Sequence, residues 1–296
     1  MIDFKTITIA DKEKYEKHLA KSEPRGCNFS FANVFFWGEQ KIAELGGVLL
    51  TFSRFGKHFV YPYPLGQGDK KAAIEALMAD ADERSIPLRI SGILRHECDE
   101  LEAMFPSVFE FRENRDGEDY VYDINDLADL KGKKYHGKRN HLNRFYAAHG
   151  NFIAEPINDN NIEAVREMTA NWFKHREVPE DDSFILEKEA LEKAFTHYKE
   201  LGLETLVIKE DDKVLAFTMA SRPNSEWLDV HFEKAIIDLE GGYTAINCEF
   251  AKYIRTKYPE IKYLNREEDM GLEGLRKAKL SYHPHHMIEK ISAVKK

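Results

Sequence analysis

The sequence predicts a mixed α+β protein with two domains, and three features of the chain indicate this. It has 296 residues, of which 43% are hydrophobic, enough for two domains of about 150 residues each. Segments with the two-residue alternation of strands are interspersed with segments of helical periodicity. The order of these segments is similar in the two halves, although no close sequence repeat is visible. We therefore expect a boundary near residue 130, between domains of residues 1–130 and 131–296.

Local signals support the elements of the first half. Asp11 is a suitable N-cap for a helix, the dipeptide at 55–56 provides a turn between two apolar strands, and Pro106 ends a helix. The Asp116-Gly117 dipeptide predicts the turn of a hairpin between the last two strands of this half. The expected elements are strand 6–9, helix 11–21, strands 48–52 and 58–63, helix 70–83, strand 88–90, helix 97–105, and strands 109–111 and 120–122.

The second half has similar signals. Gly150 is a suitable end for a basic helix, and Asp211-Asp212 predicts the first turn of an antiparallel meander. Gly241-Gly242 leads into a further helix. The expected elements are helix 134–149, strand 152–156, helices 161–174 and 186–201, meander strands 204–209, 214–221 and 226–236, helix 243–257, strand 261–265, helix 272–281 and strand 286–291.

The overall charge and the cysteines exclude several classes of protein. The chain has 43 basic against 52 acidic residues, a net charge of -9, which argues against general binding to nucleic acids or membrane surfaces. Cys27, Cys98 and Cys248 are odd in number, widely spaced and without ligand spacing, so we expect neither a disulfide framework nor a metal site. No apolar run is long enough to span a bilayer. These features predict a cytoplasmic protein with no integral membrane segment.

One stretch differs from this acidic background. Residues 131–144 read KGKKYHGKRNHLNR, with no acidic residue. On a helix, Lys131, Lys134, Lys138 and His141 share a face, where like charges repel. The stretch either binds a phosphate-rich partner, such as a tRNA, a lipid headgroup or a nucleotide, or pairs with neighbouring acids. The candidate acids are Asp123, Asp126 and Asp129.

The strand WLDVHFEKA, residues 227–235, is a candidate for catalysis. Alternation places Asp229, His231 and Glu233 on one face, away from the apolar Leu228, Val230 and Phe232. A histidine between two carboxylates is suited to deprotonating an amine nucleophile. The alternative is an ordinary solvated face of a half-buried strand. The predicted catalytic residues are Glu233 and His231.

Two loops are candidates for binding. Gly241-Gly242, in IIDLEGGYTAIN, allows an anion to approach a helix N-terminus, although the acids on its N-terminal side oppose this and an ordinary turn is the alternative. The second loop, in LNREEDMGLEGLRKAKLSYHP, follows a strand, where ligand-binding loops often lie. Helix capping and the helix dipole account for the charged residues of the helix in this stretch. They account less well for the polar and charged residues 265–269, which directly follow the strand. The candidate cleft residues there are Asn265, Arg266, Glu267 and Arg276.

The element order of the second half resembles the GCN5-related N-acetyltransferase (GNAT) fold, in which the fourth strand and the following helix splay from their neighbours and an acyl donor binds in the gap. Three blocks extend this resemblance over essentially the whole chain. They are LKGKKYHGKRNHLNRF, HFEKA followed by GGYTAINCEF, and NREEDMGLEGLRKAKLSYHP. They resemble a bacterial family related to the C-terminal synthase domain of phosphatidylglycerol lysyltransferase, akin to the Fem-type transferases.

The resemblance implies a fold and an activity. The implied fold is two tandem GNAT-like (acyl-CoA N-acyltransferase-like) domains, each a mixed, mostly antiparallel sheet flanked by helices, with the active cleft in the C-terminal domain. The implied activity is transfer of an aminoacyl group from aminoacyl-tRNA to an amine or hydroxyl acceptor, without a tightly bound cofactor. The chain departs from the lysyltransferase in lacking its long transmembrane region, so the acceptor, whether lipid headgroup, peptide or small molecule, stays open.

Specific residues follow from this hypothesis. Glu233 and His231 would lie near the chemistry, and Asn265, Arg266, Glu267 and Arg276 would line the cleft. The residues that would bind donor phosphate are Lys134, Lys138, Arg139, His141, Gly241 and Gly242. The Gly241-Gly242 loop lacks the leading basic residue usual in acetyl-CoA-binding relatives, which counts against an acyl-CoA donor. Two alternatives remain: an acyl-CoA-dependent N-acyltransferase, and a binding protein that kept the fold without the chemistry.

Overall fold

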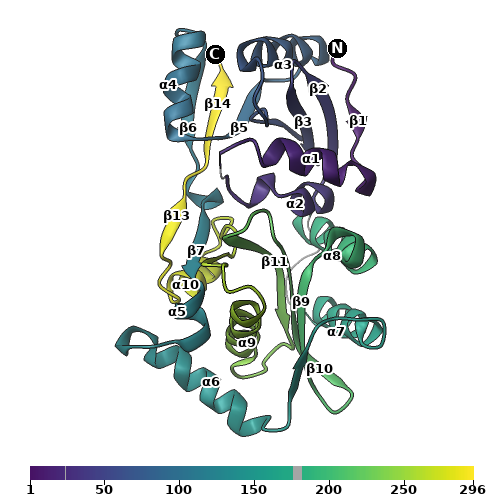
Figure 1. Ribbon diagram of the computed structural model, residues 1–296, viewed down its shortest axis with the longest axis vertical. Coiled ribbons are helices and arrows are strands. Elements are labelled where there is room, and N and C mark those ends of the chain that lie inside the picture. Colours follow the sequence, from purple (N-terminus) through teal and green to yellow (C-terminus); the bar gives the residue numbers. More distant parts are fainter. Residues whose placement is uncertain (24, 176–181) are drawn as a thin grey trace.

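The computed structural model describes residues 1–23, 25–175 and 182–296, and these form two sheets of seven strands each. The first sheet lies at the end of the molecule that carries both termini (Figure 1). In spatial order its strands are β1 (Lys5–Thr6), β2 (Glu39–Leu45), β3 (Val48–Phe55), β4 (His58–Pro62), β5 (Arg89–Ile93), β14 (Ile291–Lys295) and β6 (Phe109–Glu113). All neighbours are antiparallel except β4 and β5.

The second sheet repeats this design. In spatial order its strands are β13 (His286–Ile288), β7 (Asp119–Asp123), β12 (Tyr263–Asn265), β11 (Trp227–Ala235), β10 (Lys213–Ser221), β9 (Glu204–Glu210) and β8 (Ile153–Glu155). Again a single neighbouring pair, β11 and β12, is parallel. The predicted mixed α+β class is confirmed, as is the predicted meander, which corresponds to β9, β10 and β11.

Helices cover both sheets. Those of the first half are α1 (Lys12–Leu19), α2 (Phe31–Phe36), α3 (Lys70–Arg84) and α4 (Arg95–Met104). Those of the second half are α5 (Ile124–Asp129), α6 (His136–Ala148), α7 (Ile162–Lys174), α8 (Asp182–Leu201), α9 (Gly242–Lys257) and α10 (Glu273–Leu280). Short 3-10 turns add η1 (Ile9–Asp11), η2 (Cys27–Phe29), η3 (Arg115–Gly117) and η4 (Lys133–Tyr135).

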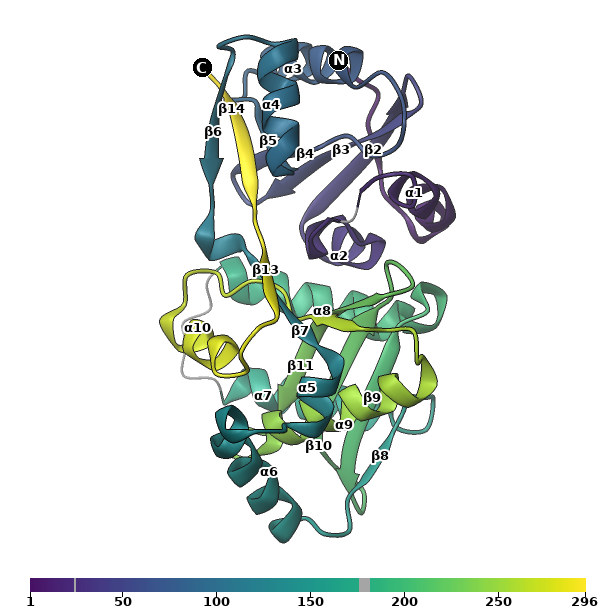
Figure 2. The same cartoon turned by 60° about the vertical axis from the view of Figure 1, so that its left-hand side comes forward.

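Two apolar cores hold these layers together. One core joins the first sheet to α7 and α8 on one face of the second sheet, for example through Phe36, Phe173 and Phe232. The other core lies on the opposite face, beneath α5, α6 and α9, and includes Leu142 and Val230. Figures 1 and 2 show α2 between the two sheets, directly above the β11 end of the second sheet.

The C-terminal segment crosses from one sheet to the other. After pairing with β7 as β13, the chain continues into the first sheet as β14, between β5 and β6 (Figure 2). The predicted hairpin between strands 109–111 and 120–122 is therefore wrong, because β6 pairs with β14 in the first sheet and β7 pairs with β12 and β13 in the second. Both sheets contain residues from before and after residue 130.

Candidate active site

The parallel strands β11 and β12 separate after a short pairing. Trp227–Asp229 pairs with Tyr263–Asn265, and beyond Asp229 strand β11 continues without β12 beside it. Arg266 turns away from β11 and donates its backbone N–H to the Tyr120 carbonyl on β7. The side chain of Glu233 therefore lies where these two strands have diverged, and α9 begins nearby.

A buried ion pair fills this gap. The Arg266 guanidinium lies 2.7 Å from the Glu233 carboxylate, and their side chains are only 13% and 10% exposed. The guanidinium also lies over the rings of Tyr122 and Tyr282, 5.6 and 4.9 Å from their centroids. Asn247 of α9 donates from Nδ2 to Glu233 at 3.3 Å. Stacking and pairing fix the guanidinium in one orientation.

Lys138 of α6 reaches the same place. Its ammonium lies 3.7 Å from the centroid of the Tyr282 ring. Burial, together with the positive charge of Arg266, lowers the pKa of Lys138 to about 8. No carboxylate among the described residues lies within ion-pair distance of it. The structure thus brings together three of the predicted site residues, Lys138, Glu233 and Arg266.

Two buried polar atoms in this group have no partner among the described residues: Nη1 of Arg266 and Oδ1 of Asn247. Buried donors and acceptors are nearly always hydrogen-bonded, so an unpaired donor and an unpaired acceptor in one group indicate a place for a ligand or ordered water. We call this group the splay cluster. It comprises Lys138, Glu233, Asn247, Arg266 and Tyr282.

The rest of the basic stretch lies mainly against neighbouring acids and carbonyls. Lys131 pairs with Asp129 at 2.8 Å and Lys134 with Asp126 at 3.0 Å. Arg139 donates to the carbonyls that follow α5, and His141 is exposed. Local pairing with acids therefore accounts for Lys131 and Lys134, and Lys138 alone of the predicted phosphate-binding side chains enters the splay cluster.

The Gly241-Gly242 loop has a packing role. Gly241 has a left-handed φ of 77°, and a methyl group there would collide with the backbone carbonyl of His141 on α6. A methyl group at Gly242 would come within 2.9 Å of Leu239. The amide of Gly242 is already bonded to the Leu239 carbonyl. Gly241 therefore allows α6 to approach the start of α9.

A second group of polar residues lies between the two sheets. The register of β10 and β11 shifts between Met219 and Ala220. Met219 lies opposite Phe232 and Ala220 lies opposite Val230, so His231 is the extra residue of a β-bulge. The imidazole of His231 accordingly lies 2.7 Å from Ser221 Oγ through Nε2 and 2.9 Å from Glu267 through Nδ1. Burial lowers the pKa of His231 to about 4, so it is neutral.

This bulge corrects the predicted strand pattern. Phe232 packs into the core with α7 and α8, whereas Leu228 and Val230 pack beneath α9, so the three do not share a face. His231 and Glu233 contact different partners: Glu267 for the first and Arg266 for the second. The expected face shared by Asp229, His231 and Glu233 is wrong for Glu233, because the bulge at His231 interrupts the alternation, whereas Asp229 lies on the same side as His231.

Asp119 is the centre of the second group. Its buried carboxylate accepts from the Cys27 amide at 2.7 Å, from Asn265 at 2.9 Å and from the Lys290 ammonium at 3.0 Å. The turn at Glu267 has φ 57°, and Lys279 of α10 donates to the carbonyls of residues 266, 267 and 268. We call the group the inter-sheet cluster. It comprises Cys27, Asp119, Ser221, Asp229, His231, Glu267, Glu268 and Lys290.

The predicted cleft residues are divided between these places. Arg266 is in the splay cluster, Glu267 is in the inter-sheet cluster, and Asn265 supports the latter through Asp119. Arg276 lies apart, where it pairs with Asp269 at 2.8 Å and Asp116 at 2.6 Å. Sequence reasoning did not single out Asp119, Ser221, Asn247, Lys279, Tyr282 or Lys290, although Asn247, Lys279 and Tyr282 lie within the blocks that carry the family resemblance.

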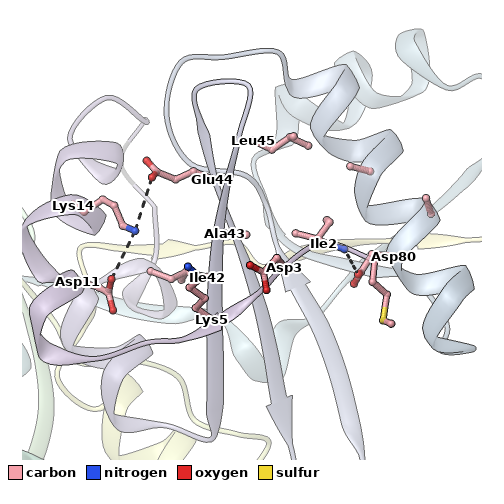
Figure 3. Close-up of a pocket in the computed structure, with 13 residues that line it drawn as sticks. Ile2, Asp3, Lys5, Asp11, Lys14, Ile42, Ala43, Glu44, Leu45 and Asp80 are labelled. Atoms are coloured by element: carbon pink, nitrogen blue, oxygen red, sulfur yellow. Dashed lines mark hydrogen bonds and ion pairs between the residues drawn. The ribbon is translucent and has the colours of Figure 1, made fainter.

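Two further features, a possible metal-ligand group and a surface hollow, lie outside the splay cluster. Ligand atoms of Cys27, Asp119 and Glu268 lie within 4.8 Å of one another, but the Lys290 ammonium already bonds Asp119 and lies 3.8 Å from Cys27 Sγ, so a cation is in place. A hollow of about 620 Å³ lies on the first sheet (Figure 3). Its Lys14 is 3.9 Å from Glu44, and none of its lining residues belongs to either cluster.

Comparisons with known proteins identify relatives along nearly the whole chain. The family model described as phosphatidylglycerol lysyltransferase, C-terminal, matches residues 19–294. A crystal structure of a conserved protein of unknown function from Bacteroides thetaiotaomicron is 37% identical, with a TM-score of 0.91 and 100% of both chains covered. Comparison with curated proteins found no match.

Two further structures share the fold at lower identity. L-PGS from Bacillus licheniformis is 18% identical, with a TM-score of 0.65 over 96% of this chain and 92% of that one. A tandem GNAT protein from the clavulanic acid biosynthesis pathway is 11% identical, with a TM-score of 0.50 over 99% and 98%. The tandem GNAT-like fold is confirmed. Within the described ranges, no helix is both long and apolar enough to cross a membrane.

Proposed function

The chain belongs to the family of phosphatidylglycerol lysyltransferase C-terminal domains, and from this we propose that it is an acyltransferase that uses aminoacyl-tRNA. In the proposed reaction, an acceptor amine or hydroxyl attacks the ester carbonyl of the donor. The bond from the carbonyl carbon to the ribose oxygen breaks as the bond to the acceptor forms, and the proton that the acceptor loses ends on the leaving ribose hydroxyl. The ester is already activated, so the protein must mainly position both substrates and assist proton transfer.

The splay cluster supports this proposal most directly. The free Nη1 of Arg266 provides a fixed donor for the carbonyl oxygen of the ester as negative charge develops on that oxygen. Glu233, 2.7 Å from the same guanidinium, provides a carboxylate to accept the proton of the acceptor. The main observation in support of this proposal is that the unpaired Nη1 of Arg266 and the carboxylate of Glu233 lie side by side where β11 and β12 diverge.

Lys138 extends the cluster toward the donor. Its ammonium is held inside the cluster by the Tyr282 ring, while neighbouring cations of the basic stretch lie on the surface of α6 and the turn before it. We propose that Lys138 contacts the terminal phosphate or ribose of the tRNA and that the surface cations contribute non-specific attraction. A charged tRNA donor and the free cysteines Cys27, Cys98 and Cys248 fit a cytoplasmic location without a tightly bound cofactor.

An acyl-CoA donor has less support from the geometry. The glycine loop that would hold its pyrophosphate packs directly against the His141 backbone, and it carries no basic residue on its N-terminal side. Thermal shift measurements with a series of acyl-CoA molecules test this alternative. Stabilisation by any of them would favour it over aminoacyl-tRNA.

The test of the proposal is a transfer assay with radiolabelled aminoacyl-tRNAs and a panel of amine and hydroxyl acceptors. The variants Arg266→Lys and Glu233→Gln should each lower the rate about 100-fold, since each removes a group that acts on the reacting atoms. Arg222→Lys is the matched control, because Arg222 also pairs with a glutamate, Glu260 at 3.0 Å, and stacks on a tyrosine. Equal activity of all three variants, or no transfer from any charged tRNA, would contradict the proposal.

A further inference from the structure

The inter-sheet cluster holds more negative than positive groups. Its carboxyl groups are Asp119, Asp229, Glu267 and Glu268. The ammonium groups that face them are those of Lys290 and Lys279, and His231 is neutral. If all four acids were ionised, the cluster would carry two uncompensated negative charges in a buried place. Such charges are costly unless the acids take up protons or a cationic group binds.

Asp229 is the member that lacks a partner. It is 3% exposed, yet within residues 1–23, 25–175 and 182–296 no donor is hydrogen-bonded to its carboxyl group. The strand register places Asp229 opposite Ser221 on β10 and beside Asn265 on β12. Its carboxyl group is therefore directed to the face that carries the rest of the inter-sheet cluster.

The charged and titratable groups that act on Asp229 come from several elements. They are His231 on its own strand, Asp119 on β7, Glu267 after β12, and Lys290 between β13 and β14. Burial raises the pKa of Asp229 to about 7, and the negative charges of Asp119 and Glu267 act in the same direction. His231 and the charge of Lys290 act against this rise, but His231 is neutral above about pH 4, and the Lys290 ammonium is bonded to Asp119 and to Asn28.

We propose that the inter-sheet cluster binds a primary ammonium group, with the Asp229 carboxylate as its main partner. An ammonium has three N–H donors. Asp229 offers an unused carboxylate, Ser221 offers a hydroxyl oxygen, and the carboxyl oxygens of Glu267 and Glu268 lie in the same cluster. A bound ammonium supplies positive charge that the cluster lacks, and it satisfies the one carboxyl group without a donor.

The bound ammonium has two chemical sources. It is either the α-ammonium of an aminoacyl group or the amine of an acceptor molecule, and in both cases its role in transfer rests on the function proposed above. Arg266 and Glu267 are consecutive residues whose side chains enter the two clusters. A substrate that binds its ammonium here lies beside the turn that also positions Arg266.

Isothermal titration calorimetry with three small probes tests the proposal. Glycinamide stands for an aminoacyl α-ammonium, ethanolamine stands for an acceptor amine, and tetramethylammonium is a cation without N–H donors. Binding of glycinamide or ethanolamine should be about 20-fold tighter at about pH 7.5 than at about pH 5.5, because the Asp229 carboxyl must be ionised. Preference for glycinamide indicates the aminoacyl group, whereas preference for ethanolamine indicates the acceptor.

The variant Asp229→Asn should weaken amine binding at least about tenfold at about pH 7.5, since it keeps the shape and removes the charge. Glu226→Gln is the control, because that carboxylate is exposed and paired with Lys262. Tetramethylammonium should not bind. Absence of amine binding, equal binding of tetramethylammonium, or unchanged binding by the Asp229 variant would overturn the proposal.

These measurements are independent of the transferase proposal. They use the full chain without tRNA, and the pH dependence of the wild-type protein alone decides the result if the variant does not fold. Amine binding without transfer activity would contradict the proposed transferase function and support the ammonium site. Transfer activity without amine binding would support the transferase function and contradict the ammonium site.

Discussion

Replacing Asp229 with asparagine should make the protein more stable, and the gain should grow with pH. The carboxyl group has a pKa of about 7 in the folded chain, whereas the ordinary value is 3.8. The folded state therefore holds a proton that the unfolded chain loses above about pH 4, and the free energy of unfolding falls as the pH rises toward 7. Above pH 7 the whole penalty is present.

The size of this effect follows from the two pKa values. A difference of about three pKa units between the folded and unfolded states is a penalty of about 4 kcal/mol at pH 8, against about 2 kcal/mol at pH 5. Asparagine has the same shape and no charge, so it escapes this penalty at every pH. The variant should thus gain roughly 2 to 3 kcal/mol more over the wild type at pH 8 than at pH 5.

Urea denaturation at both pH values, followed by tryptophan fluorescence, measures the difference. Glu267 and Glu268 also have raised pKa values because they are buried, so the wild type itself should lose stability with pH. Comparing variant with wild type at each pH isolates Asp229. Glu226→Gln, an exposed control, should show no pH-dependent gain. An Asp229 variant with the same stability difference at both pH values would refute the reasoning.

Three further outcomes are expected. Carbon-13 NMR of the lysine side chains should show one group that titrates near pH 8 and disappears in Lys138→Arg; a set titrating only near the ordinary value would contradict the pKa of about 8. Gly241→Ala should lower the free energy of unfolding by about 2 kcal/mol or more, because φ is 77° and the methyl group meets His141. Gly274→Ala, which has open space around it, should cost nothing in the same urea titration, and equal effects would refute this account. Deleting residues 289–296 removes β14 from between β5 and β6, so cooperative unfolding should be lost; a sharp thermal transition in the shortened chain would show that β14 is dispensable.

Local signals in the sequence predicted local structure well. The meander, the turn at 55–56 between β3 and β4, and the N-terminal helix were all expected from patterns within a few residues. The hairpin across Asp116-Gly117 was wrong for a non-local reason. Strand β14, from the far end of the chain, pairs with β6 and displaces β7 to the other sheet. A turn signal predicts that the chain turns, but not which strand lies beside it.

The site was predicted only in part, for a similar reason. The sequence identified Lys138, Glu233 and Arg266, because each lies in a charged or polar stretch that its surroundings did not explain. It also grouped His231 with Glu233, since alternation was assumed to continue through the strand. The bulge depends on how β11 pairs with β10, which no pattern within β11 reveals. Asp119 and Lys290 were not singled out in the sequence, and they are buried because the two sheets meet around them.

The two clusters are connected through one short turn. Arg266 and Glu267 follow each other directly, and the left-handed φ of 57° at Glu267 sends their side chains into different clusters. The ammonium of Lys279, 8% exposed, bonds the carbonyls of this turn and holds it in place. Because a left-handed non-glycine residue is strained, such a turn persists only where its surroundings fix it. Binding at Asp229 therefore acts next to the residue that positions Arg266. A substrate that fills the inter-sheet cluster would stabilise the same turn on which the proposed transfer depends, and this couples recognition of an amine to the geometry of the reacting ester.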